Sequence, residues 1–299
     1  MPLVWALPEV DCQVATQQKS ANLHWSKAEC TKATLSKPID DGFMTSPNHI
    51  LITGASGGLG DALARHYAVP GRSLLLWGRD AARLEAVAAV CRATGATVAI
   101  RMLDLSDSAA AVAALEADDT AHAIDLAIFA AGLGDTRAPG ALVENAAQIV
   151  RLGLVDFVAP AAMAAALADR MARRGGGGIV LVGSAAAFHA LPFAAGYSGA
   201  KAGLARFAEA LRIGVKPHGV RVTLVSPGFI DTAAARRTPG PKPFVIQPAD
   251  AAARIARAAE QGRAHAILPW PFALLRWFDR LLPAVVRDRL LLGLTPPER

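Results

Sequence analysis

The sequence of 299 residues has few cysteines and no long basic run, and each scarcity excludes a class of protein. Its three cysteines, Cys12, Cys30 and Cys91, have a number and spacing that fit neither a disulfide framework nor a metal site, so no bound metal is expected. No run of Lys and Arg exceeds two residues, and no nucleic-acid-binding motif is present. The net charge of +6 therefore indicates scattered surface arginines, and no nucleic-acid partner is expected.

Targeting and membrane-spanning patterns are also missing. The chain starts with MPLVWALPEVDC, which has neither a basic region nor a long apolar stretch and so argues against a secretory signal. No uninterrupted run of about 18 apolar residues occurs, which argues against a spanning helix. These absences predict a cytoplasmic protein.

The chain does contain enough apolar residues for a large core. Hydrophobic residues make up 53% of it and charged residues 19%, which excludes disorder across the whole chain. Residues 1–47 show no clear period and predict a poorly ordered extension. Residues 48–268 predict a single domain, and residues 269–299 predict a helical extension.

Short apolar runs alternate with helical patterns along the predicted domain. The expected strands are 49–53, 73–77, 97–103, 124–130, 179–182, 220–225 and 265–268. The expected helices are 58–68, 80–94, 107–117, 142–173, 195–214 and 248–260. Such alternation predicts an α/β fold with a doubly wound parallel sheet, in which ligands bind at the carboxyl ends of the strands.

A glycine-rich turn joins the first predicted strand to the first helix, with glycines at 54, 58 and 60 in a TGxxxGxG pattern. Glycines there let the backbone turn tightly and approach a pyrophosphate, and the start of the helix offers free N–H groups to phosphate oxygens. The alternative is an ordinary glycine-rich loop. The candidate cofactor-binding residues of the turn are Thr53, Gly54, Ser56, Gly57, Gly58, Leu59 and Gly60.

Tyr197 and Lys201 are four residues apart at the start of a predicted helix, so they lie on one face, one turn apart. A free tyrosine ionises at about pH 10, too high for easy proton exchange at neutrality. A neighbouring ammonium favours the phenolate and makes a tyrosine usable as a general acid and base. Taken alone, the pair could also be a common helix-surface contact.

Together these motifs resemble the short-chain dehydrogenase/reductase family, whose members have a TGxxxGxG turn and a YxxxK pair on a Rossmann fold. Ser184 ends a predicted strand and precedes Tyr197 by 13 residues, the interval usual in that family. The resemblance covers roughly residues 48–268. It implies that Ser184 orients a substrate carbonyl, that Tyr197 exchanges the proton, and that Lys201 tunes Tyr197 and binds the nicotinamide ribose.

The end of the second predicted strand bears on which nicotinamide cofactor is used. Gly78 occupies the position where an NAD site would place an acidic residue, and Arg79 follows it. A guanidinium can pair with a 2′-phosphate, so this arrangement resembles that of the NADP(H)-preferring members. Alternatively, Arg79 is a solvated surface charge. Asp80 is expected to cap the next helix.

By resemblance, further cofactor contacts follow three other strands. They are Asp104 and Leu105 after the third strand, Ala130, Ala131 and Gly132 after the fourth, and Pro227, Gly228, Ile230 and Thr232 after the sixth. After the fourth strand the family often has Asn-Asn-Ala-Gly, which here is Phe-Ala-Ala-Gly. The glycine and the small residues remain, but the bracing asparagines do not.

A second departure from the family is Asp156, which aligns with a fourth catalytic asparagine. If that residue acts through its backbone carbonyl, holding a water beside the lysine, the change of side chain is tolerable. Alternatively, a carboxylate near Lys201 raises the pKa of the lysine. Asp156 is therefore included among the candidate catalytic residues.

The carboxyl-terminal stretch from Pro269 to Leu292 is rich in leucine and tryptophan, with interspersed arginines, and predicts amphipathic helices broken at Pro283. Three interpretations remain open. The stretch could cover the substrate cleft or the domain's own surface, join an oligomer interface, or lie in a membrane interface as a peripheral contact.

The predicted function is NADP(H)-dependent, reversible reduction of a ketone or aldehyde, in a homo-oligomer (a dimer or tetramer). Phe188, Leu191, Phe193 and Phe229 would give the pocket apolar walls and favour an apolar substrate. The alternative is a protein that binds NADP(H) as a sensor with little turnover.

Overall fold

The computed structural model describes residues 47–134, 136–138, 140–237 and 242–293. The extension expected at 1–47 lies, apart from Pro47, outside this part of the chain, as do residues 294–299 of the expected helical tail.

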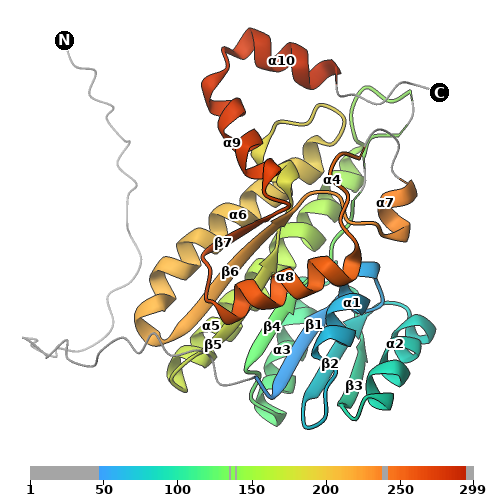
Figure 1. Ribbon diagram of the computed structural model, residues 1–299, viewed down its shortest axis with the longest axis vertical. Coiled ribbons are helices and arrows are strands. Elements are labelled where there is room, and N and C mark those ends of the chain that lie inside the picture. The colour runs from blue at the N-terminus through green and yellow to red at the C-terminus, as the bar shows by residue number, and fades with distance from the viewer. Residues whose placement is uncertain (1–46, 135, 139, 238–241, 294–299) are drawn as a thin grey trace, which may run out of the picture. The chain divides into compact units, whose positions relative to one another are not determined.

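Seven parallel strands form one sheet in the order β3-β2-β1-β4-β5-β6-β7 (Figure 1). Their bounds are β1 His49–Thr53, β2 Ser73–Gly78, β3 Thr97–Met102, β4 Leu126–Phe129, β5 Gly177–Val182, β6 Val220–Pro227 and β7 His265–Leu268. The doubly wound parallel sheet is thus confirmed. The strand order reverses between β1 and β4, and ligands of such sheets bind in the crevice beyond the strand ends at this point.

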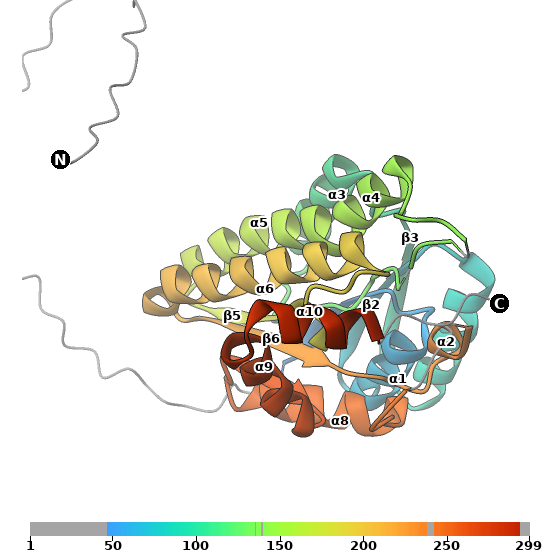
Figure 2. The ribbon, with the colours of Figure 1, turned by 90° about the horizontal axis from the view of Figure 1, so that it is seen from above.

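Helices cover both faces of the sheet (Figure 2). One face carries α1 Gly58–Tyr67, α2 Ala81–Ala93 and α8 Pro248–Glu260; the other carries α3 Ser108–Ala121, α4 Ala146–Gly153, α5 Ala159–Arg173 and α6 Ala195–Val215. The remaining helices are α7 Ala233–Arg237, α9 Pro271–Leu281 and α10 Ala284–Gly293, and the single turns are η1 Leu154–Val158, η2 Ala185–Phe188 and η3 Lys216–His218.

Two hydrophobic cores lie between the sheet and its helices, and the strands contribute to both. In β1, Ile50 and Ile52 face the α1 side, whereas Leu51 between them faces the α5 side. Successive side chains of a strand point to opposite faces, so a strand covered on both sides must be apolar throughout. For this reason the sequences of β1, β2 and β5 consist mainly of consecutive apolar residues.

The helix expected at 142–173 begins later and is interrupted. Asn145 caps α4 by accepting a hydrogen bond from the Gln148 amide at 2.9 Å, so the helix begins at Ala146. Between α4 and α5 the chain makes the π-helical turn η1. Pro160 has no N–H to donate to the carbonyl of Asp156 four residues earlier, and a wider turn accommodates that loss. The π turn contains Asp156.

This helical stretch, Ala146–Arg173, is long and apolar enough to span a membrane when judged by length and composition alone. In the fold it is a core element, because Met163, Leu167 and Met171 on its inner face are fully buried against the sheet. A core helix of a soluble domain passes the same length and composition test.

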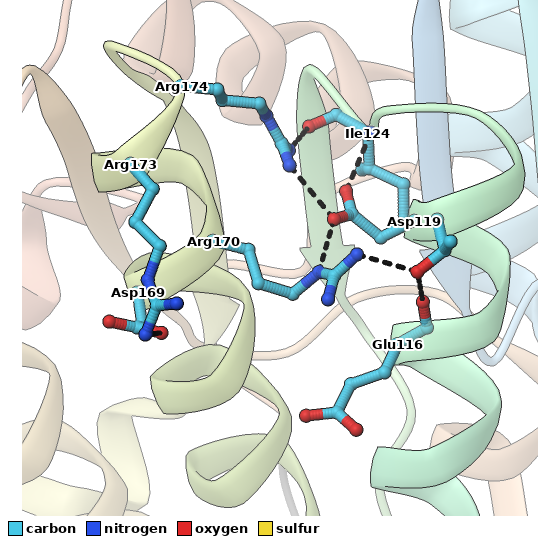
Figure 3. Close-up of polar contacts among 8 residues, drawn as sticks. Glu116, Asp119, Ile124, Asp169, Arg170, Arg173 and Arg174 are labelled. Atoms are coloured by element: carbon cyan, nitrogen blue, oxygen red, sulfur yellow. Dashed lines mark hydrogen bonds and ion pairs between the residues drawn. The ribbon is translucent and has the colours of Figure 1, made fainter.

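The end of α3 is tied to α5 by an ionic cluster around Asp119, so α3 extends to Ala121 instead of ending at 117 (Figure 3). The Asp119 carboxylate, 1% exposed, lies 2.5 Å from Arg170 Nε and 2.8 Å from Arg174 Nη1. It also accepts the Ile124 amide at 2.9 Å. Burial favours the neutral acid, but these hydrogen bonds outweigh it and hold the pKa of Asp119 below its usual value.

Candidate functional site

The candidate residues gather at the edge of the sheet where β1, β4, β5 and β6 end. The first of the loops there is the glycine turn between β1 and α1. Gly54 has a φ of +71°, and a Cβ placed on it would lie 2.7 Å from the Cα of Ala131. A Cβ on Gly60 would lie 2.1 Å from the carbonyl oxygen of Gly54. Both positions therefore require glycine, since the backbone passes too close for any side chain.

The loops after β4 and β6 lie against this turn. Thr53 Oγ1 accepts a hydrogen bond from the Ala131 amide at 3.2 Å, which joins the ends of β1 and β4. A Cβ on Gly58 would lie 2.7 Å from Cγ2 of Thr232. Thr232 in turn begins α7 by accepting the Ala235 amide at 3.1 Å. Residues far apart in the sequence thus form one glycine-lined cradle at the start of α1.

A pocket of about 860 Å³ opens beside this cradle, lined by Gly57, Gly58 and Thr232 together with charged side chains of α1 and α7. The first residues of α1 border it. Gly57 precedes the helix and has no side chain to satisfy the free N–H groups there. Such a helix start attracts an anion through its N–H groups and the positive end of the helix dipole.

An acidic side chain at the end of β2 would meet the Ser56 hydroxyl. A Cβ on Gly78 would lie 2.9 Å from Oγ of Ser56 in the glycine turn. Arg79 is exposed beside it, and Asp80 accepts the Arg83 amide at 3.0 Å, which confirms Asp80 as the cap of α2.

Asp104 and two arginines lie near the same strand end. Asp104 accepts the Ser106 amide at 2.9 Å, and this bond, with help from the charges of Arg79 and Arg151, lowers its pKa. Leu105 beside it is buried. Arg151 of α4 was not among the sequence candidates, because only the packing of α4 brings it to this end of the sheet.

Lys201 is almost fully buried and makes three contacts. Its ammonium lies 5.9 Å from the centre of the Tyr197 ring, donates to the Val182 carbonyl at 3.2 Å, and lies 3.1 Å from Oδ1 of Asp156. Burial alone would lower the pKa of Lys201. The charge of Asp156, with a further contribution from Tyr197, outweighs burial and raises that pKa above its ordinary value.

Asp156 is held in place by the loop after β4. Its Oδ1 accepts the Leu133 amide at 3.0 Å as well as contacting Lys201. A Cβ on Gly132 would lie 2.7 Å from this oxygen and 3.2 Å from the ammonium of Lys201. Of the two alternatives for Asp156, the geometry therefore favours the carboxylate close to the lysine. Its part in catalysis stays a prediction.

Ser184 follows β5 and begins η2, which packs against α6. Its Oγ accepts the Ala186 amide at 3.1 Å, which orients the side chain at the strand end. The strand end and the start of α6 thus place Ser184, Tyr197 and Lys201 at one edge of the sheet. The roles assigned to them, and to the cofactor contacts, stay predictions.

Glu144 was missed by the sequence analysis. It is buried, and its carboxylate accepts the Gly196 amide at 3.0 Å, at the start of α6 and one residue before Tyr197. A Cβ on Gly196 would lie 3.2 Å from Oε1 of Glu144. The sequence pattern places Glu144 in the helix expected at 142–173, whereas the structure places it in the loop before α4, and no local pattern connects it to α6, which begins 51 residues later.

The first helix of the carboxyl-terminal stretch packs on the loops that follow β5 and β6. Figures 1 and 2 show α9 and α10 at the edge of the sheet where the strands end. The Phe272 ring packs so closely on Gly228 that a Cβ there would lie 2.3 Å from the ring, and Arg276 lies 5.9 Å from the centre of the Phe188 ring. Phe272 also contacts Phe229, with ring centres 6.4 Å apart. These contacts favour the cleft-covering interpretation for the inner face of α9.

These residues fit a dinucleotide. The glycines of the turn let its backbone pack closely on the neighbouring loops, and the start of α1 beside it supplies free N–H groups for pyrophosphate oxygens. Arg79 follows β2 on one side of the glycine turn, and Lys201 and the Pro227–Gly228 loop lie on the other side, at the ends of β5 and β6. In the part of the chain that the structure describes, no group of three or more His, Cys, Asp or Glu residues could hold a metal ion.

Comparison with known proteins agrees with this arrangement. Residues 48–241 match the family model described as short chain dehydrogenase. An uncharacterized oxidoreductase of Myxococcus xanthus is 33% identical over 245 residues, which are 80% of this chain and 94% of the relative.

Two solved structures show the same fold. A bulky-bulky ketone specific alcohol dehydrogenase from Comamonas testosteroni has a TM-score of 0.67 at 28% identity, covering 83% of this chain and 94% of the other. A short-chain dehydrogenase from Sphingobium yanoikuyae in complex with NADPH has a TM-score of 0.67 at 28% identity, covering 78% and 93%. The chain therefore belongs to the short-chain dehydrogenase/reductase family and is an oxidoreductase that uses a nicotinamide cofactor.

Proposed function

We propose that the enzyme is an NADP(H)-dependent carbonyl reductase that reversibly converts a ketone or aldehyde to an alcohol. The observation that carries the proposal is the buried Lys201, which lies against Tyr197 on α6 at the edge where the glycine turn opens. A carbonyl oxygen that gains a proton needs a donor beside it, and a phenol next to a fixed ammonium is such a donor.

The proposal assigns separate tasks to Ser184, Tyr197 and Lys201. The cofactor, when bound, supplies or accepts the hydride. Ser184 Oγ donates a hydrogen bond to the substrate carbonyl and orients it. Tyr197 gives its phenolic proton to the forming alkoxide, and Lys201 fixes the charge beside Tyr197 and donates to the cofactor ribose.

The choice of NADP(H) rests on the end of β2. Ser56 occupies the space beside Gly78 that an acidic side chain would need, and Arg79 offers a guanidinium to a 2′-phosphate. The NADPH bound to the Sphingobium yanoikuyae relative supports the same choice.

Arg79→Ala is expected to lower kcat/KM with NADPH by roughly 10- to 100-fold and to leave kcat/KM with NADH almost unchanged. The reason is the loss of charge-assisted hydrogen bonds to the phosphate. Steady-state kinetics with both cofactors measure this. Arg92→Ala, at the other end of α2, is the matched control and should behave like the parent. A parent enzyme with the higher kcat/KM for NADH would contradict the proposal.

The proposed substrate class rests on aromatic rings next to Ser184 and the Pro227–Gly228 loop. Phe272 of α9 contacts Phe229 and lies against Gly228, and Arg276 of the same helix lies over Phe188 of η2, which begins after Ser184. Such walls favour an apolar carbonyl compound. The alcohol dehydrogenase of Comamonas testosteroni, described as specific for bulky-bulky ketones, is consistent with this substrate class.

The outer face of the tail suggests where such a substrate comes from. Trp270, Leu274, Trp277 and Leu281 follow helical spacing and are 70%, 53%, 59% and 77% exposed. The tail between residues 269 and 293 carries four arginines and two aspartates. An apolar stripe with indole rings and a net positive charge fits a lipid surface with anionic headgroups, so we propose peripheral membrane contact of a cytoplasmic enzyme through this face.

The full chain is expected to co-sediment with vesicles that contain phosphatidylglycerol. In the triple variant Leu274→Gln/Trp277→Gln/Leu281→Gln the bound fraction is expected to fall by at least about tenfold, because the stripe supplies the apolar area that would be buried in the membrane. Ile213→Gln, an exposed apolar residue of α6, is the control. Recovery of the parent in the supernatant would contradict membrane contact. A change of mass in solution for the triple variant would instead assign the stripe to the predicted dimer or tetramer.

A further inference from the structure

Two buried carboxylates lie against the amino-terminal part of α6, and one of them pairs with the ammonium of Lys201. Asp156 is fully buried on η1, 3.1 Å from Lys201 Nζ. Glu144 is buried on the loop before α4 and accepts the amide of Gly196, the neighbour of Tyr197. The start of α6 therefore meets one positive and two negative groups, all shielded from solvent.

A carboxylate differs from an asparagine at position 156 in one respect that matters here. The two side chains have almost the same shape, and both can accept the Leu133 amide through Oδ1. Only the carboxylate carries a charge that opposes the ammonium of Lys201. In a buried environment this charge is weakly screened, so it acts on every titratable group within several ångströms.

We propose that the negative charge of Asp156, assisted by that of Glu144, offsets the effect of the Lys201 ammonium on Tyr197. Near neutral pH the phenol of Tyr197 then keeps its proton, which it can donate to a carbonyl, and is only a weak base toward an alcohol. The proposal rests on the proposed function and adds that carbonyl reduction is favoured over alcohol oxidation near neutral pH. Asp156 is a positioning residue in this scheme, since it acts on Tyr197 through Lys201. The raised pKa of Lys201 agrees with a tight ion pair.

The other charged groups near this end of α6 come from four elements. They are His189 after η2, His265 on β7, Arg276 on α9 and Arg151 on α4. Burial lowers the pKa of His265, with a further contribution from Arg276 that Glu209 partly opposes, and its ring contacts Ser226 Oγ at 2.9 Å. Arg276 lies over Phe188. Asp156 contacts Lys201, and Glu144 contacts the Gly196 amide at the start of α6.

The chain offers an unusual opportunity for a direct test, because it has only two tyrosines, Tyr67 and Tyr197. Tyr67 is buried in the α1 core, where burial raises its pKa, and its hydroxyl has no hydrogen-bond partner among the described residues. Tyr67→Phe keeps the ring and removes an unsatisfied hydroxyl, so it should not destabilise the fold. In this background the ultraviolet absorbance of tyrosinate reports on Tyr197 alone.

The experiment titrates the cofactor-free Tyr67→Phe protein and its Asp156→Asn derivative, with circular dichroism recorded at each pH. The midpoint of the tyrosinate absorbance is expected to fall by about one pH unit in Asp156→Asn, because one buried opposing charge is removed. Glu144→Gln is expected to shift the midpoint in the same direction. Glu209→Gln is the matched control. Glu209 lies about 18 Å along α6 from Tyr197, so its loss should not shift the midpoint.

Turnover provides a second measurement. With an alcohol that the enzyme oxidises, Asp156→Asn should move the pH profile of the oxidation rate to lower pH by a similar amount. A merely structural role for Asp156 would instead lower the rate at every pH.

An unchanged or higher absorbance midpoint in folded Asp156→Asn would overturn the inference. If Asp156→Asn does not fold, Glu144→Gln decides by the same criterion. A protein without turnover on any carbonyl compound would count against the proposed function, and the absorbance titration would still decide this inference.

Discussion

Tyr197→Phe is expected to lower kcat for carbonyl reduction by about 100- to 10,000-fold, the usual contribution of a positioned general acid. The substitution removes the phenolic proton and keeps the ring. The ring contact with Lys201 and the ion pair of Lys201 with Asp156 therefore remain, and the cofactor cradle is untouched. NADPH affinity, measured by fluorescence titration, should stay within about twofold of the parent.

This result also separates the two function classes. An enzyme that works by proton transfer at Tyr197 loses turnover and retains cofactor binding. A protein that only senses NADP(H) keeps its output when the hydroxyl is lost. Tyr67→Phe is the matched control, because it removes the other tyrosine hydroxyl of the chain at a site in the α1 core, and its kcat should equal that of the parent. Wild-type turnover in Tyr197→Phe would be incompatible with the proposed mechanism.

Gly60→Ala is expected to lower the free energy of unfolding by about 3 kcal/mol and to abolish detectable cofactor binding. A Cβ at this position would lie 2.1 Å from the oxygen and 2.6 Å from the carbon of the Gly54 carbonyl. Both atoms belong to the backbone, so no side-chain rotation relieves the overlap. Either α1 or the turn must move, and each movement changes the cradle that the start of α1 forms with Gly54.

Urea unfolding and fluorescence titration with NADPH measure the two effects. Gly214→Ala is the control, since Gly214 lies in α6 with nothing within 4 Å of a Cβ built on it. That substitution should stabilise the protein by about 0.5 to 1 kcal/mol through helix propensity alone. A Gly60→Ala protein with parental stability and cofactor affinity would show that the turn is not the rigid cradle described above.

Much of the fold could be predicted from local patterns. The seven strands were expected at the positions where the structure has them, to within a few residues, because a parallel strand covered on both faces must be apolar and short. The glycine turn could be located for a similar reason, since only glycine permits the backbone approach seen between Gly60 and Gly54.

The boundaries that were predicted wrongly depend on contacts between distant segments. The extension of α3 past residue 117 depends on Asp119 meeting Arg170 of α5 and Arg174, the residue after α5, which lie about 50 residues further along the chain. The start of α4 at Ala146 and the π turn depend on the Asn145 cap and on Pro160, whose effects on a long helical pattern could not be weighed from hydrophobic spacing.

The sequence by itself determined the class of sheet, the phosphate turn and the Tyr197–Lys201 spacing, because each follows from interactions within a few residues of one another. Only the tertiary structure decided what surrounds that pair. It brought the carboxylate of Asp156 to Lys201, that of Glu144 to the start of α6, and Phe272 onto Gly228. Each of these contacts joins different elements, and burial between packed elements is what gives their charges and shapes an effect on the site.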